Sequence, residues 1–117
     1  MSQTLPVVVD YDSLFSKVAE VVRSNAKGVI RALLFGSLAR REASQDSDVD
    51  LLLVWPADGD ADYQWEASME TASLVDRLTD RHCLPLVYTE VDYRRMPQRY
   101  PHLAESLSRD GIDLLTY

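Results

Sequence analysis

Apolar residues recur at helical spacing in two segments of the chain. The first segment includes Leu14, Phe15, Val18, Val21 and Val22. Asp12 can cap this helix, which we expect to reach about Asn25, because an aspartate side chain accepts hydrogen bonds from free N–H groups of a first helical turn. The second helix is predicted over residues 62–82, and its apolar face comprises Trp65, Met69, Ala72, Val75 and Leu78.

Four shorter apolar segments are typical of strands rather than helices. They span residues 30–35, 49–55, 84–89 and 112–115, and the first two are mostly apolar runs that favour buried strands. Short helices are expected over residues 36–42 and 103–109, whereas the basic residues 93–100 are expected to be irregular around Pro97. Helices that alternate with strands predict the α/β class, with helices packed on a sheet.

The length of 117 residues corresponds to a single domain, residues 1–117. Hydrophobic residues make up 46% of the chain, as in an ordinary globular protein. No apolar run approaches the roughly 18 residues that a membrane helix needs. Met1 to Pro6 lack the basic start and apolar stretch of a signal peptide. We therefore expect a cytoplasmic protein that does not bind membranes.

The formal net charge of −7 restricts the partners of the chain. An acidic chain does not bind a phosphate backbone on its own, so no direct nucleic-acid binding is expected. The charge favours metal-bridged phosphates or a basic partner, or it serves solubility alone. The single cysteine, Cys83, excludes an internal disulfide framework, and beside His82 we interpret it as a packed thiol at a helix end rather than a metal ligand.

Candidate chemistry is concentrated between the first two predicted strands. Gly36 and Ser37 follow the first strand directly, and the absent side chain of Gly36 lets a ligand oxygen approach the backbone. A helix that starts here would direct free N–H groups at a phosphate. After ten further residues, Asp48 and Asp50 open the next strand, where their spacing of two places both carboxylates on one face. Such a pair predicts a Mg²⁺ site.

A purely structural interpretation exists for each half of this segment. Gly-Ser is common at strand-to-helix turns, and Ser47 to Asp50 could cap a turn. The two halves occur together in the order strand, turn, helix, loop, strand. That combination favours a functional site over chance.

The segment resembles the signature of the polymerase-beta-type nucleotidyltransferase superfamily, which reads Gly-Ser, ten residues, Asp-x-Asp. Ala39-Arg40, Ser47, the Leu-Leu-Leu-Val strand and the ending DGIDLLTY are similar to the minimal nucleotidyltransferase (MNT) group. The resemblance implies a nucleotidyltransferase fold, a small mixed sheet with helices packed on it. It also implies transfer of a nucleoside monophosphate from an NTP to a hydroxyl group. It assigns nucleotide contacts to Gly36, Ser37, Arg40 and Ser47, and metal binding and catalysis to Asp48 and Asp50. For Arg40 the alternative is a solvated surface side chain.

The resemblance further implies an antitoxin that moves AMP from ATP to a tyrosine of a helical HEPN-type toxin. The acidity of the chain fits a basic toxin partner. Two alternatives remain open. One is an inactive binding module that neutralises its partner by complex formation. The other is an antibiotic-modifying nucleotidyltransferase, for which the chain is short because those enzymes carry an additional domain.

One feature departs from the superfamily pattern. A third carboxylate is usual on the strand after the long helix, where it acts as the base for the attacking hydroxyl. Residues 84–89 contain no acidic residue, and Glu90 and Asp92 follow at the far end of that strand. We therefore expect no carboxylate of this strand beside Asp48 and Asp50, which makes the source of the base an open question.

Overall fold

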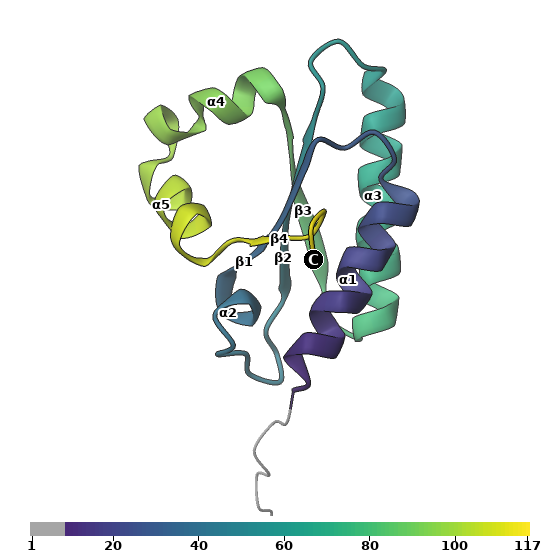
Figure 1. Cartoon of the computed structure of the whole chain (residues 1–117), viewed down its shortest axis with the longest axis vertical. Coiled ribbons are helices and arrows are strands. Elements are labelled where there is room, and N and C mark those ends of the chain that lie inside the picture. The colour runs from purple at the N-terminus through teal and green to yellow at the C-terminus, as the bar shows by residue number, and fades with distance from the viewer. Residues whose placement is uncertain (1–8) are drawn as a thin grey trace, which may run out of the picture.

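The computed structural model describes residues 9–117, within which four strands form one sheet flanked by five helices (Figure 1). The strands are β1 (Arg31–Phe35), β2 (Val49–Trp55), β3 (Cys83–Thr89) and β4 (Ile112–Asp113). The helices are α1 (Tyr11–Asn25), α2 (Gly36–Ala39), α3 (Ala61–Thr79), α4 (Glu90–Arg99) and α5 (Pro101–Asp110). The signal-peptide prediction for Met1 to Pro6 lies outside the described residues.

The sheet has the strand order β3-β2-β1-β4. β1 is antiparallel to both β2 and β4, whereas β2 and β3 are parallel and are connected by the crossover helix α3. The predicted α/β class with a small mixed sheet is therefore confirmed. Among the described residues, no helix is long and apolar enough to span a membrane.

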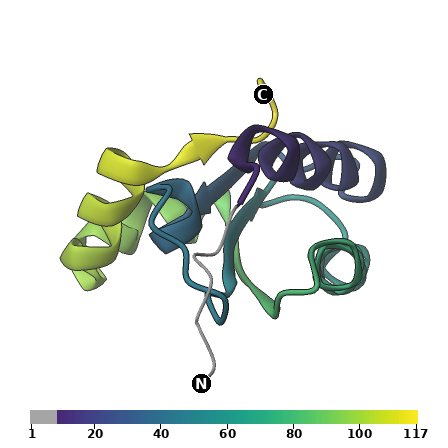
Figure 2. The same cartoon turned by 90° about the horizontal axis from the view of Figure 1, so that it is seen from below.

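The two faces of the sheet are covered by different helix pairs. Figure 2 shows α1 and α3 packed on one side and α4 and α5 on the other. Alternate residues of β2 divide between these two cores, as the period of a strand requires. Val49, Leu51, Leu53 and Trp55 belong to the α1–α3 core, and Leu52 and Val54 belong to the α4–α5 core.

The start of α1 differs from the prediction by one cap residue. Asp10, not Asp12, is the N-cap, and its carboxylate accepts a hydrogen bond of 3.1 Å from the Ser13 N–H. Asp12 instead lies in the first turn, where its charge is favourable at the positive end of the helix. The predicted end of this helix at Asn25 is confirmed.

The predicted apolar face of the long helix is wrong at its two ends. Trp65 and Leu78 are 58% and 57% exposed. The sheet is contacted instead by a face of small and polar residues, Gln64, Ala67, Ser68, Thr71, Ala72 and Val75. The large indole of Trp55 occupies the space opposite this face, and its Nε1–H donates a 2.8 Å hydrogen bond to the Ser68 hydroxyl. The buried face of α3 can consist mainly of small residues because the bulky side chain at this contact comes from the sheet.

Residues 93–100, predicted to be irregular, are largely helical because α4 extends from Glu90 to Arg99. The Thr89 hydroxyl caps the helix by accepting a 3.2 Å hydrogen bond from the Asp92 N–H. Pro97 lies inside α4 near its C-terminal end and removes one N–H from the helix, while Met96 anchors the helix in the core. Two other predicted elements are shorter in the structure. α2 ends at Ala39 rather than at residue 42, and β4 comprises only Ile112–Asp113.

Candidate active site

The antiparallel pairing of β1 and β2 brings the two halves of the sequence motif together. Phe35, the last residue of β1, pairs with Asp50 near the start of β2. Gly36 begins α2 directly after Phe35 and therefore lies against Asp50. Residues that are fourteen positions apart in the sequence thus share one end of the sheet.

Gly36 is required at this position for two separate reasons. Its φ of +78° lies in the left-handed region that side-chain-bearing residues rarely adopt. A Cβ atom there would also overlap a carboxylate oxygen of Asp50 and would lie 2.9 Å from its Cγ. The sequence predicted a close approach of a ligand oxygen to Gly36. In the folded chain the atom that approaches is the Asp50 carboxylate itself.

Asp50 lies on the face of β2 that also carries Leu52 and Val54. Asp48 was expected to open this strand, but β2 begins at Val49, so Asp48 directly precedes it. Asp50 is half-buried and Asp48 is exposed. Burial raises the pKa of Asp50, the nearby charge of Asp48 raises it further, and the guanidinium of Arg40 partly opposes both effects. Asp50 is thus held where its negative charge is unfavourable unless a cation lies nearby.

The donor set at this end of β2 fits a hard divalent cation. Two carboxylates on one strand face can hold Mg²⁺, which takes its remaining ligands from water and substrate phosphates. The raised pKa of Asp50 indicates unsatisfied negative charge of the kind that such a cation would neutralise. Within residues 9–117, no group of three or more His, Cys, Asp or Glu side chains converges on a possible metal position.

Arg40 is anchored rather than freely solvated. Its Nε donates a 3.2 Å hydrogen bond to Glu42, and its Nη1 lies 3.5 Å from an oxygen of Asp110 at the end of α5. A hydrogen bond from Arg109 lowers the pKa of Asp110, and Arg40 lowers it further. The ion pair connects α2 to α5. It also keeps a positive charge near Asp50.

Ser47 supports the loop that leads into β2. Its hydroxyl accepts a 2.8 Å hydrogen bond from the Ser44 N–H. Arg81 donates to the carbonyl oxygens of Ser44 and Ser47 at 3.0 and 2.8 Å. Ser37 stands in the first turn of α2, and its carbonyl accepts a 2.9 Å bond from the Glu42 N–H. Both serines thereby fix the two segments that flank the carboxylates.

The position beside Asp50 on the parallel strand β3 is occupied by a leucine. Asp50 pairs with Leu84, and Leu52 pairs with Leu86. Glu90 and Asp92 begin α4 at the opposite end of β3, where Glu90 bonds Arg94 at 2.6 Å. At about 3.3 Å per strand residue, Glu90 lies roughly 17–20 Å beyond Leu84. β3 thus presents an apolar leucine, rather than a carboxylate, beside Asp50.

Cys83 is a packed thiol, as expected, although it begins β3 rather than ending a helix. Burial, followed by the charges of Asp76 and Asp50, raises its pKa to about 12. His82 lies 3.6 Å from Asp76 and is exposed. A thiol with so high a pKa is neutral at neutral pH, which agrees with its interpretation as a packed side chain.

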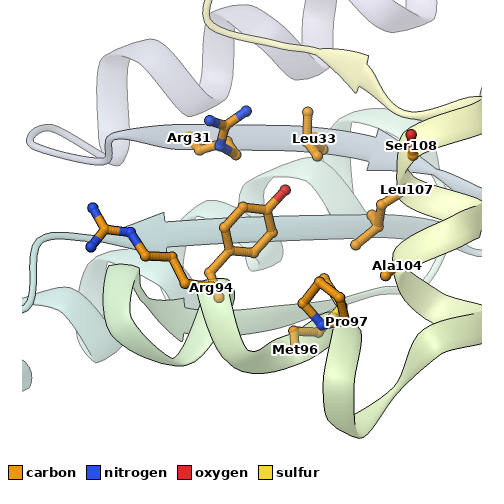
Figure 3. Close-up of a pocket in the computed structure, with 9 residues that line it drawn as sticks. Arg31, Leu33, Arg94, Met96, Pro97, Ala104, Leu107 and Ser108 are labelled. Atoms are coloured by element: carbon orange, nitrogen blue, oxygen red, sulfur yellow. The ribbon is translucent and has the colours of Figure 1, made fainter.

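A cavity of about 430 Å³ lies between β1, α4 and α5, on the same sheet face as Asp50 (Figure 3). Figure 3 shows Arg31 and Leu33 of β1 opposite Met96 and Leu107 of the helices. None of the six residues singled out from the sequence motif lines it. The cavity is therefore separate from the carboxylate pair.

Comparison with known proteins supports the motif assignment at the level of the family. The family model described as "Polymerase beta, Nucleotidyltransferase" matches residues 16–116. A solved toxin–antitoxin structure with AMP-PNP is 17% identical, with a TM-score of 0.59, over 91% of this chain and 73% of that chain. The toxin–antitoxin MntA-HepT is 16% identical, with a TM-score of 0.54, over 88% of this chain and 70% of that chain. Identities this low show a shared fold alone. No curated protein sequence matches the chain.

Proposed function

The chain belongs to the polymerase beta nucleotidyltransferase family, and on that basis we propose that it moves AMP from ATP to a hydroxyl of a partner protein. The observation that carries the proposal is the contact of Gly36 with Asp50. This contact brings the Gly36-Ser37 turn against a carboxylate pair suited to Mg²⁺. A structurally similar toxin–antitoxin complex was solved with AMP-PNP, an analogue of ATP.

In this proposal each side chain has a defined role. Gly36 and Ser37 hold the triphosphate, and Ser37 contributes a hydroxyl and a backbone N–H. Arg40 and Ser47 contact the nucleotide or hold the loops that do. Asp48 and Asp50 hold Mg²⁺, which when bound neutralises the phosphoryl charge and assists both the attacking and the leaving oxygen.

The transfer step requires positioning more than proton abstraction. The acceptor hydroxyl oxygen bonds to the α-phosphorus, the bond to the pyrophosphate oxygen breaks, and the hydroxyl proton passes to solvent. A general base is typically worth about 10²–10⁴ in rate, so its absence slows the reaction without abolishing it. A bound protein acceptor offsets part of this loss through proximity.

We further propose that the acceptor is a basic, helical HEPN-type toxin and that the chain is its antitoxin. The net charge of −7 supports a basic partner, and both structural relatives described above are toxin–antitoxin complexes. The leucine beside Asp50 supports a second candidate, a module that neutralises the toxin by binding alone.

Single-turnover transfer of label from ATP to the protein encoded beside this chain distinguishes the two candidates. We expect the wild type to label the partner and Asp48→Asn to form the same complex without labelling it. A stable complex in which neither protein becomes labelled would contradict the proposed enzymatic activity and support the binding module. Labelling of a small antibiotic instead would support an antibiotic-modifying nucleotidyltransferase, the other alternative that the sequence leaves open.

A further inference from the structure

β3 exposes two large apolar side chains on the face that carries the catalytic carboxylates. Leu84 is 67% exposed and Leu86 is 36% exposed. Their pairing partners on β2 are Asp50 and Leu52, and paired residues of parallel strands point to the same side of a sheet. Tyr88, the next residue on this face, already packs with the α4–α5 core. The two leucines therefore form an apolar surface between the covered core and the carboxylates.

The strand order determines the direction from which an acceptor can approach. β2 lies between β1 and β3. Gly36 and Ser37, which we assign to the triphosphate, follow β1 and thus lie on one side of Asp50. The attacking and leaving oxygens of phosphoryl transfer lie roughly in line across the phosphorus. Because pyrophosphate leaves toward β1, the acceptor oxygen must arrive from the side of β3.

We infer that Leu84 and Leu86 position the acceptor by docking the apolar body of the partner side chain that carries the hydroxyl. The inference rests on the proposed nucleotidyl transfer and names the surface of this chain that the partner protein contacts. This docking role fits the chemistry of the exposed leucines. A carboxylate at this position could bind a metal ion, whereas a leucine can contact only an apolar group.

Charge around the leucines further defines the docking segment of the partner. The segments that lead into β2 and β3 carry the exposed acids Asp46, Asp48 and Asp80. Their three arginines, Arg40, Arg41 and Arg81, are already bound to carboxylate or carbonyl oxygens of this chain. A complementary segment thus combines an apolar side chain with flanking basic residues. Pro85 lies between the two leucines and lacks an N–H group, as is usual in an edge strand. Docking through side chains is favoured over addition of a strand.

The test measures transfer kinetics and nucleotide binding on the same variants. Leu84→Ala and Leu86→Ala are compared with Leu78→Ala, which truncates a leucine on α3 whose exposure lies between those of the other two. Leu84→Met is the conservative rescue, and Leu84→Asp adds a carboxylate beside Asp50. Label transfer from ATP to the protein encoded beside this chain gives kcat and the acceptor KM. Calorimetry with ATP and Mg²⁺ gives the nucleotide Kd, and circular dichroism verifies folding.

We expect each alanine variant to raise the acceptor KM about tenfold, within the range that truncation of a central interface side chain produces, with an unchanged nucleotide Kd. Leu84→Met and Leu78→Ala should behave as wild type. Leu84→Asp should lose transfer even though it adds a metal ligand. Wild-type kinetics in both alanine variants, or a weakened nucleotide Kd, would overturn the docking role and leave the proposed function intact. A wild type that binds ATP but labels no partner would overturn both.

Discussion

The face of the sheet that carries Asp50 has two ends with opposite environments. At one end Leu33, Leu52 and Val54 are buried beneath Met96 and Leu107 of α4 and α5. At the other end Asp50 and Leu84 lie side by side without a covering helix among the described residues. The same strand, β2, contributes to both. The buried residues of β2 stabilise the fold, whereas the charged end of the same strand carries the candidate site, because a charge is tolerated only where water or a cation can reach it.

The largest expected difference between the two ends is in stability. Leu52 is fully buried, so Leu52→Ala should lower the free energy of unfolding by about 2–5 kcal/mol through lost burial and a residual cavity. Leu84→Ala removes a mostly exposed side chain and should change it by less than about 0.5 kcal/mol. Urea denaturation of both variants measures the contrast. Equal losses would show that the open end is packed like the covered one.

A smaller effect is expected at the junction of Gly36 and Asp50. Gly36→Ala should destabilise the fold by roughly 1–3 kcal/mol, because it combines a strained backbone with overlap on the carboxylate. Gly28→Ala is the matched control. It shares a positive φ, +94°, but its Cβ would meet Trp55 at an ordinary 3.8 Å. Only the Gly36 variant should also lose Mg²⁺-dependent ATP binding, and equal binding by both would refute the close contact.

The smallest expected effect concerns the charge of Asp50. Its pKa is raised above 3.8 in the folded state, so the folded chain binds the proton more tightly than the unfolded chain. Wild-type stability from this group therefore falls as pH rises from about 3.8 through the raised pKa. Without divalent cation, Asp50→Asn should melt at a higher temperature than wild type at neutral pH, and this advantage should vanish in acid.

Thermal melts across pH measure this difference, with Asp58→Asn as a control at an exposed loop position outside the site. Addition of Mg²⁺ should remove the advantage of Asp50→Asn by stabilising only the wild type. If Asp50→Asn melts below wild type at neutral pH, the carboxylate stabilises the fold and its unfavourable burial has been misjudged.

The sequence predicted β2 to the residue, since a short, mostly apolar run that ends at Pro56 is compatible with few other structures. It also predicted Asp48 and Asp50 on one strand face from strand period, whereas β2 begins at Val49 and includes only Asp50 of the pair. It could not predict that Gly36 contacts Asp50, because that contact depends on the pairing of Phe35 with Asp50. Nor did it predict α4, because Pro97 was read as a helix breaker, and the packing of Met96 is visible only in three dimensions.

We propose above all that Asp48 and Asp50 form one cation-dependent nucleotide site. Titration calorimetry with ATP, with and without Mg²⁺, tests it most directly on wild type, Asp48→Ala and Asp50→Ala, with Asp58→Ala as a control. We expect the wild type and Asp58→Ala to bind ATP only in the presence of Mg²⁺. Each site variant should lose most of that affinity, because one carboxylate cannot hold the cation and phosphate alone. Unchanged binding in both site variants would contradict the assignment.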